Sequence, residues 1–330
     1  MSEINTLPMR VTALVAILLV CGGISAAQNS PPQPAVTSTK AILLNGYTQI
    51  LYKHDWTSGS DGFQVRRGRL GISGDVAKNI SFKFLFDIAK TPYLIDAQVD
   101  VAFSKQFTFR FGQFKVPFSL ESYTSTADLD TINRAQVVDK LSPGRDIGAS
   151  GRDVGASVWA KWSIADINLA LLNGSGINKA DMDKHKDIAG RVVLAPLDWL
   201  RVGAAIYDGE VSTTSGPARR DRTGLEVALW RGEFSFKAEY ISAADGRMKA
   251  NGWYAQAGYF ILPKQVQAVL KFDSFDKNRD LGSDRSDVLT IGVNWFFTTK
   301  TKLQVNYERI RLETGKALGN VLLAQFQAGF

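Results

Sequence analysis

The sequence predicts an all-β fold, a transmembrane antiparallel up-and-down β-barrel of about 16 strands. Three observations predict it. Apolar and polar residues alternate with a period of two in many successive segments, short and long connections alternate between them, and the last segment ends on the aromatic residue Phe330. Each segment is about long enough for a tilted membrane strand, which takes roughly 9 to 11 residues.

The N-terminus has the features of an export signal. Arg10 supplies a positive charge, residues 11–20 are apolar apart from Thr12, and small residues follow at 25–27. The apolar run is too short for a membrane-spanning helix, which needs about 20 residues. We therefore expect a signal peptide at 1–27, a flexible periplasmic leader at 28–40, a transmembrane barrel at 41–330, and a location in the bacterial outer membrane.

Cysteine usage agrees with a barrel. The single cysteine, Cys21, lies in the expected signal peptide. The exported chain would then have no disulfide, so core packing or a closed hydrogen-bonded sheet would have to stabilise it.

The strands are expected wherever the period-two pattern continues for a sufficient length. Phe82, Phe84 and Phe86 illustrate it, because they alternate with less apolar neighbours. The expected strands, in order, are 43–52, 63–76, 80–90, 94–103, 107–118, 152–162, 164–173, 187–197, 200–210, 220–231, 233–243, 252–262, 266–276, 287–298, 302–313 and 320–330.

The connections differ in length according to their position. Those after even-numbered strands are mostly very short, whereas those after odd-numbered strands are mostly longer and polar. This alternation places all tight turns on one side of the membrane and all long loops on the other, as expected for periplasmic turns and external loops. Aromatic residues near the strand ends are expected to form interfacial girdles. They are Trp199, Trp230, Trp253, Tyr254, Tyr259, Phe260, Trp295, Phe296 and Phe297.

The longest connection, residues 119–151, is the third long loop. A stretch of this length among compact turns is expected to be functional. We expect it to fold into the barrel and narrow the lumen; the alternative is an external loop that packs on a neighbouring subunit.

Residue parity predicts which charged side chains face the lumen. In 63–76 it directs Arg67 and Arg69 inward and leaves Arg66 near the mouth, and in 80–90 it directs Lys83 inward. Other cations expected inside are Lys161, Arg191, Arg201, Lys237 and Lys271. The acids expected inside are Asp87, Asp96, Asp100, Glu226, Glu239, Asp273 and Glu308.

The fifth strand requires a change of phase. Its first three phenylalanines are expected to face lipid, and so are the apolar residues after Gly112, which we interpret as a β-bulge. Arg110 and Lys115 then both point inward. The residues assigned to lipid are Phe107, Phe109, Phe111, Phe114, Val116 and Phe118.

Several segments resemble the phosphate-selective porin O and P family. They are 63–74 (FQVRRGRLGISG), 96–100 (DAQVD), 111–121 (FGQFKVPFSLE) and 133–135 (NRA), of which the run Gly-Gln-Phe-Lys-x-Pro-Phe-Ser is the most specific. The resemblance covers essentially the whole exported chain. It implies a trimeric sixteen-stranded outer-membrane channel for small anions, with phosphate or polyphosphate as the selected solute in the best-defined members.

A series of arginines and lysines along a pore would replace the hydration of an anion with charge-assisted hydrogen bonds. The candidate anion-binding residues are Arg66, Arg67, Arg69, Lys83, Arg110, Lys115 and Arg134. The alternative for each is packing against lumenal carboxylates. From Ser119 to Asp153 six acids outnumber four bases, which favours a broader, weakly selective porin instead.

Other classes have less support. A net charge of +7 is spread along the chain, which does not favour nucleic-acid binding. His54 and His185, the only histidines, are expected in external loops without an organised nucleophile, so an enzyme is disfavoured. Asp-rich stretches at 181–187 and 273–287 lack EF-hand spacing, and we expect no metal or cofactor. A structural or adhesive barrel remains an alternative; the expected partners are inorganic anions such as phosphate, outer-membrane lipid and two further copies of the chain.

Overall fold

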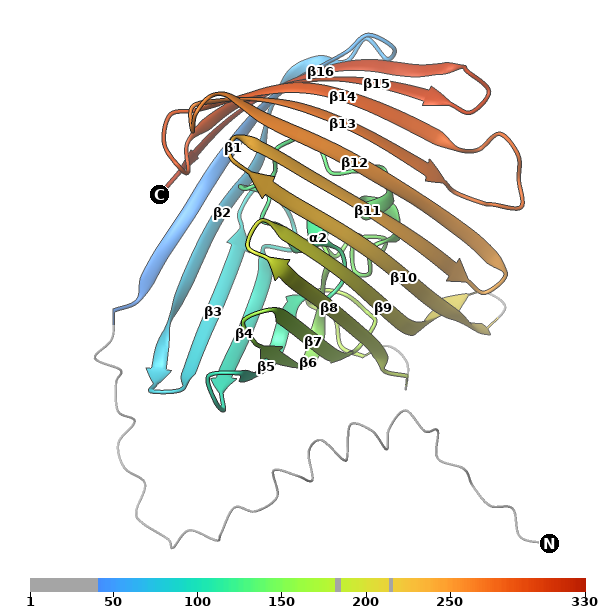
Figure 1. The fold of residues 1–330 in the computed structure, drawn as a ribbon. Coiled ribbons are helices and arrows are strands. Elements are labelled where there is room, and N and C mark those ends of the chain that lie inside the picture. Colours follow the sequence, from blue (N-terminus) through green and yellow to red (C-terminus); the bar gives the residue numbers. More distant parts are fainter. Residues whose placement is uncertain (1–40, 182–184, 214–215) are drawn as a thin grey trace, which may run out of the picture. The chain divides into compact units, whose positions relative to one another are not determined.

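A computed structural model describes residues 41–181, 185–213 and 216–330. The expected signal peptide at 1–27 and leader at 28–40 lie outside the described residues. The rest of the chain forms a closed barrel of 16 antiparallel strands, in which β1 pairs with β16 and every other pair is consecutive in sequence (Figure 1). Closure leaves no strand edge without a partner, which is the condition for a sheet in lipid.

The strands agree closely with the predicted segments. For example, β8 and β13 begin and end at the expected residues. The strands are β1 (Leu43–Asp55), β2 (Asp61–Ala77), β3 (Ile80–Asp87), β4 (Leu94–Ala102), β5 (Phe107–Lys115), β6 (Arg152–Lys161), β7 (Ala165–Leu172), β8 (Asp187–Leu197), β9 (Leu200–Thr213), β10 (Gly216–Arg231), β11 (Phe234–Asp245), β12 (Met248–Leu262), β13 (Val266–Asp276), β14 (Ser286–Phe296), β15 (Lys302–Leu312) and β16 (Ala317–Gly329).

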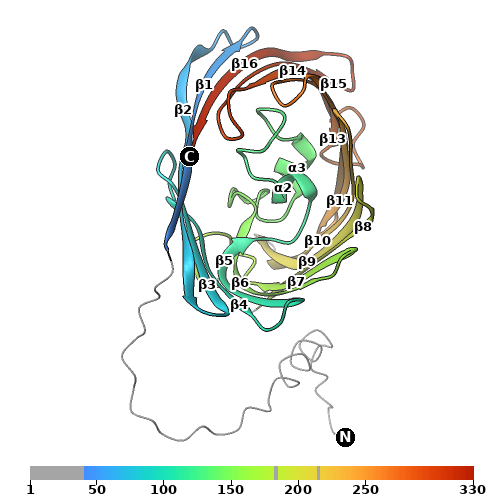
Figure 2. The same cartoon turned by 60° about the vertical axis from the view of Figure 1, so that its left-hand side comes forward.

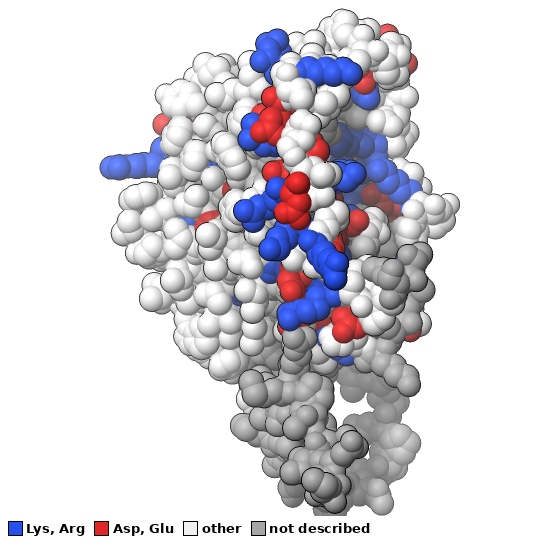
Figure 3. All heavy atoms as spheres, turned by 90° about the vertical axis from the view of Figure 1, so that its right-hand side faces the viewer, with Lys and Arg blue, Asp and Glu red and all other residues white. Residues whose placement is uncertain are grey.

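The period-two pattern separates the two faces of the sheet. In β13, Leu270 is 51% exposed on the outside, whereas its neighbours Val269 and Lys271 are buried inside. In β14, Ile291 is exposed while Thr290 is buried. The outer face is therefore apolar and the inner face polar. On the face in Figure 3, charged side chains gather in one band, and the surface to the left of it is almost entirely uncharged.

Most of the expected girdle aromatics are exposed on the outside, among them Trp199, Trp253 and Trp295. Tyr254 is an exception. It is 1% exposed, and its hydroxyl donates to Glu239 inside the barrel at 2.7 Å. Its assignment to a girdle is wrong because it lies on the inward side of β12, next to the outward Trp253.

The long connection between β5 and β6 folds into the barrel, as predicted, and carries two short helices, α2 (Leu120–Tyr123) and α3 (Gln136–Leu141) (Figure 2). We call residues 116–151 the internal segment. It starts earlier than expected, because β5 ends at Lys115.

The apolar residues after Gly112 do not face lipid. Phe114, Val116 and Phe118 are at most 2% exposed and belong to an interior cluster with residues of α3. The register of β5 is continuous with both neighbouring strands, so the predicted bulge at Gly112 is also wrong. Gly112 instead has a φ of 110°, and a Cβ there would lie 2.2 Å from the carbonyl oxygen of Ala97, so only glycine fits.

Within the described ranges, none of the helices has the length and apolar character that crossing a membrane would require.

Candidate functional site

The internal segment is attached to one half of the barrel wall. Its helix α3 packs against β11, β12 and β13. Nearby, Ile132 N donates to Asn306 Oδ1 at 2.6 Å, and Lys271 Nζ donates to the carbonyl oxygen of Asn133 at 2.8 Å. Side chains of β13 and β15 thus provide hydrogen-bond partners that a neighbouring strand would otherwise give to the backbone of this irregular stretch.

A buried carboxylate fixes the start of α2. Glu239 of β11 accepts hydrogen bonds from Leu120 N at 2.9 Å and from Glu121 N at 2.6 Å. Amide groups at a helix start have no partner within the helix and favour a negative charge. Glu239 therefore places α2 at a defined position on the wall.

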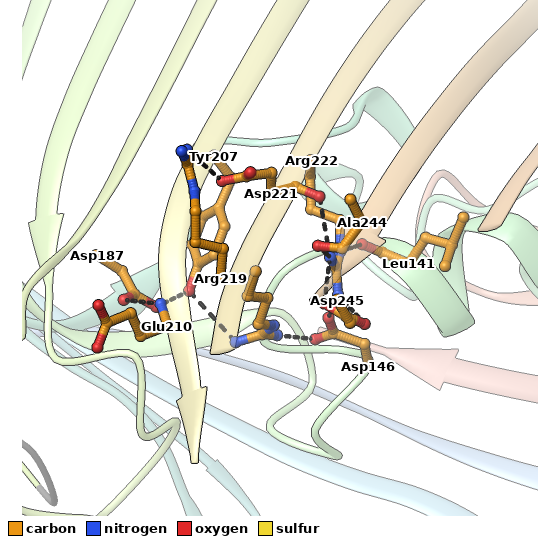
Figure 4. A network of polar contacts seen from close by, with 11 residues as sticks. Leu141, Asp146, Asp187, Tyr207, Glu210, Arg219, Asp221, Arg222, Ala244 and Asp245 are labelled. Carbon is orange, nitrogen blue, oxygen red and sulfur yellow. Dashed lines mark hydrogen bonds and ion pairs between the residues drawn. The ribbon is translucent and has the colours of Figure 1, made fainter. Parts of the chain in front are cut away.

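A second attachment joins the end of α3 to β10. Asp146 contacts two inward arginines, Arg220 and Arg222, and Arg222 also contacts Asp245 of β11 (Figure 4). Arg222 Nε further donates to the carbonyl oxygen of Leu141 at 3.0 Å. The second half of the internal segment is thereby tied to the same side of the barrel.

Two of the cavities beside the opposite wall lie along the lumen. A loop-side cavity of about 190 Å³ lies near the connections after odd-numbered strands, and a turn-side cavity of about 490 Å³ lies near the turn between β2 and β3. The loop-side cavity is lined by Arg67, Arg69, Asp87, Lys90, Thr91, Pro92, Ile95, Thr126, Arg134, Arg145, Gly148, Ser150 and Ile177. The charged residues lining the turn-side cavity are Asp75, Lys83, Asp96, Asp100, Arg110 and Lys115.

Basic side chains dominate the loop-side cavity. Five of them line it against one carboxylate, that of Asp87. Asp87 is in turn paired with Arg69, whose Nε lies 3.2 Å from Asp87 Oδ2. The remaining four cations, those of Arg67, Lys90, Arg134 and Arg145, share no second acid on the cavity lining.

Among the described contacts, four of the predicted site residues donate only to neutral groups: Arg66, Arg67, Lys115 and Arg134. Arg67 Nη1 donates to Gln49 Oε1 at 2.9 Å, and Arg134 donates to two backbone carbonyl oxygens at 3.1 and 2.7 Å. Among the ion pairs found in the described ranges, none involves Arg66, Arg67 or Arg134. Their positive charge is thus not neutralised by direct contact with a carboxylate.

A β-bulge explains how two consecutive arginines both face the lumen. The register of β1 with β2 shifts between Gln49 and Ile50, which leaves Arg66 as the extra residue of β2. Arg66 Nη2 donates to Asn133 Oδ1 of the internal segment at 2.7 Å, while Arg67 also reaches inside. Strict alternation would have turned one of the two toward lipid.

In the turn-side cavity two of the three predicted cations, Lys83 and Arg110, are paired with carboxylates. Lys83 Nζ lies 2.9 Å from Asp96 Oδ2, and Arg110 Nε lies 2.7 Å from Asp100 Oδ1. Lys115 donates to a backbone carbonyl oxygen at the end of α2. Of the seven predicted residues, Arg67, Arg69 and Arg134 line the loop-side cavity, Lys83, Arg110 and Lys115 line the turn-side cavity, and Arg66 lines neither.

A family model, phosphate-selective porin O and P, matches residues 47–214 and 204–327. The chain belongs to this family. Together with the closed barrel, membership places it in the bacterial outer membrane as a channel-forming porin. Among the curated proteins with which the chain was compared, none matches.

Solved porin structures share the fold at low sequence identity. OmpT of Vibrio cholerae, in its trimer form, has a TM-score of 0.66 and 11% identity, over 88% of this chain and 99% of that one. The outer-membrane channel DcaP of Acinetobacter baumannii has a TM-score of 0.65 and 11% identity, over 90% and 100%. OmpF of Salmonella typhi, in complex with daunomycin, has a TM-score of 0.67 and 10% identity, over 88% and 97%.

Three acids of the porin's internal segment are bound by groups of the wall or of the segment itself, whereas Asp128 and Asp139 are exposed. Asp130 pairs with Lys237 of β11 at 2.6 Å, Asp146 pairs with β10, and Glu121 accepts from a backbone amide of its own segment at 2.9 Å. In the described ranges none of the six acids counted in the sequence lines either cavity. Lys237 and Lys271, expected as lumenal cations, hold the internal segment instead.

Lys90 and Arg145 were not among the predicted site residues. Lys90 fell in the expected strand 80–90 on the parity opposite to Lys83, but β3 ends at Asp87 and Lys90 lies in the following connection. Arg145 lies in the long connection, where no alternation defines a direction. Both line the loop-side cavity. Burial, then the charges of Arg67 and Arg66, lower the pKa of Lys90. Burial and the charge of Arg134 likewise lower the pKa of Arg145. Desolvation is the larger cause of both lowered pKa values, and the neighbouring cations add to it.

The two histidines lie apart from this site. His54 belongs to β1, so its assignment to a loop is wrong, and its Nδ1 lies 3.5 Å from Asp61. His185 Nδ1 lies 3.4 Å from Glu210. Within the described parts of the chain there is no group of three His, Cys, Asp or Glu side chains that could hold a metal ion.

Proposed function

We propose that this porin conducts small anions by passive diffusion, with inorganic phosphate or polyphosphate among its solutes. The observation that carries the proposal is the loop-side cavity, where five basic side chains face one carboxylate. An anion entering there exchanges hydration for charge-assisted hydrogen bonds, while cations are repelled. The family name supports phosphate as a solute.

The path we propose runs from the loop-side cavity, past the internal segment, to the turn-side cavity. Arg67 and Arg134 select, because they line the loop-side cavity and no carboxylate contacts them among the described ion pairs. Arg66, next to Arg67 in sequence, adds to the positive charge without lining either cavity. Lys83 and Arg110, paired with Asp96 and Asp100, contribute less. Several weak sites rather than one tight site let the ion leave again.

A second candidate is a general, weakly selective porin for small hydrophilic solutes. The turn-side cavity favours it, because three acids and three bases line this wider space. Selectivity would then come from size rather than charge.

We propose a homotrimer in the outer membrane. The similarity to a V. cholerae porin solved in its trimer form supports this assembly. Non-enzymatic conduction is proposed as the whole activity of the chain.

Phosphate block of chloride current in planar bilayers tests the proposal. Millimolar phosphate should reduce the current through the wild-type channel, and Arg67→Glu or Arg134→Glu should weaken that block. Lys277→Glu, the same charge reversal on an exposed loop, should leave the block unchanged. Conduction without phosphate block would favour the general porin, and an absence of channel steps would reject conduction altogether.

A further inference from the structure

We propose that Asp146 is a positioning residue of the pore: clamped between Arg220 and Arg222, it holds the adjacent Arg145 in the loop-side cavity. The inference rests on the proposed anion conduction and adds a device that sets the geometry of the selecting site. Residue Asp146 itself does not line either cavity.

The clamp is formed by buried charges. Asp146 Oδ1 contacts Arg220 Nη2, and Asp146 Oδ2 lies 3.0 Å from Arg222 Nη2. The three side chains are 8%, 4% and 2% exposed, respectively. A carboxylate divided between two guanidinium groups has little freedom to rotate, since each oxygen has its own donor.

The clamp is rigidly connected to the barrel. Arg222 Nη1 lies 2.7 Å from Asp245 Oδ1 of β11, and Arg220 Nη1 donates to Tyr207 Oη of β9 at 3.3 Å. Figure 4 shows these groups converging from neighbouring strands on the end of the internal segment. Asp146 and Asp245 balance the two arginines, so the clamp is not itself a free anion site.

Arg145 and Asp146 are adjacent in sequence, but their side chains contact different parts of the lumen. Arg145 lines the loop-side cavity, with Nε donating to Ser122 Oγ at 2.8 Å and Nη1 lying 3.2 Å from Asp139. Asp146 is bound to the wall of β10. A single peptide bond therefore connects Asp146, which is held at the barrel wall, to Arg145, a cation of the loop-side cavity.

The backbone around this pair is a series of turns. Residues 142–151 form neither helix nor strand, but Arg145 N donates to the carbonyl oxygen of Ser142 at 2.9 Å and Gly148 N to that of Arg145 at 2.8 Å. These bonds shape the turns locally, while side-chain contacts with the wall fix where the turns lie in the lumen. Removing the charge of Asp146 leaves two buried guanidinium groups short of a partner, which favours displacement of the stretch and of Arg145 with it.

Asp146→Asn tests the inference in planar bilayers. With Arg145 displaced from the cavity lining, its charge acts less on the passing ion, so the anion-to-cation permeability ratio should fall about twofold, with more open-channel noise. Asp128→Asn, the same charge change at an exposed position of the internal segment, should match wild type. Asp146→Glu, which keeps the carboxylate, should restore most of the selectivity.

A double variant separates positioning from general loosening. In an Arg145→Gln background, adding Asp146→Asn should change the permeability ratio no further, because the cation it positions is gone. An equal additional loss in that background would overturn the inference. So would wild-type selectivity in Asp146→Asn.

Folding is monitored by heat-modifiable migration on gels. If Asp146→Asn does not fold, Arg220→Gln, which removes half of the clamp, replaces it with the same expectations. The proposed function fails separately, if the wild-type channel itself shows no anion preference. A selective wild type with an unaffected clamp variant rejects only the role of Asp146.

Discussion

Arg66 Nη2 lies 2.7 Å from Asn133 Oδ1, so a strand on one side of the lumen is linked to the internal segment. Asn133 Nδ2 in turn donates to both carboxylate oxygens of Glu308 at 3.0 Å. A neutral amide thus stands between a cation and an acid and keeps the charge of Arg66 from being neutralised by an ion pair.

Replacing this amide with a carboxylate should suppress selectivity. In Asn133→Asp the new acid pairs with Arg66, and we expect a lower anion-to-cation permeability ratio from reversal potentials. Asn133→Ala, which removes the contact without adding charge, serves as the control and should have the smaller effect. A larger effect of alanine would mean that the contact matters for structure alone.

Neutralising a lumenal cation should reduce anion selectivity more when that cation has no carboxylate partner. Arg67→Gln should reduce anion preference more than Arg110→Gln, because Arg110 is already paired with Asp100 at 2.7 Å. Removing one partner of that pair also frees an acid, so Arg110→Gln is compared with Arg110→Gln/Asp100→Asn. If the double variant loses as much selectivity as Arg67→Gln, pairing does not decide which residues select.

Glu239 should be important for stability rather than for selectivity. Glu239→Ala leaves Leu120 N and Glu121 N without their acceptor, a loss of about 2–5 kcal/mol when buried donors are left unpaired. Urea titration of the protein folded in lipid vesicles measures it. Glu233→Ala, in an exposed turn, should be nearly neutral. Equal stability of both variants would contradict the attachment of α2.

Alkaline pH should weaken anion selectivity. Partial desolvation and the charges of Arg67 and Arg66 lower the pKa of Lys90, so this partly exposed lysine loses its positive charge at a lower pH than a lysine in free solution. Its contribution is present at neutral pH and is lost as pH rises through that lowered pKa. Reversal potentials in potassium chloride from pH 7 to pH 10 should show the decline, and Lys90→Gln should flatten it. An identical decline in Lys90→Gln would assign the titration elsewhere.

The sequence was sufficient for the strands, because alternation such as that around Leu270 and Ile291 reflects the two faces of the sheet directly. It failed where the direction of a side chain depends on contacts with residues distant in sequence. Phe114 and Phe118 are apolar enough for lipid, yet they pack on the internal segment, which no local pattern reveals.

Candidate site residues were predictable only in part. Parity placed Arg67 and Arg69 inside, but composition cannot show which cations are paired with carboxylates. Asp130 and Asp146 suggested an acidic constriction because they lie in the internal segment, whereas the fold turns both toward basic residues of the far wall. Arg145 was missed because an irregular connection has no period from which to infer direction, and Lys90 was missed because the expected strand 80–90 extended past the end of β3 at Asp87.

The reversal potential of the wild-type porin across a potassium chloride gradient tests the central claim most directly. Because the arginines Arg67 and Arg134 of the loop-side cavity have no carboxylate partner, we predict a reversal potential of the sign expected for chloride selectivity. Its magnitude should grow as the salt is diluted, because screening of the arginine charges weakens. A reversal potential of the sign expected for potassium selectivity would contradict the account.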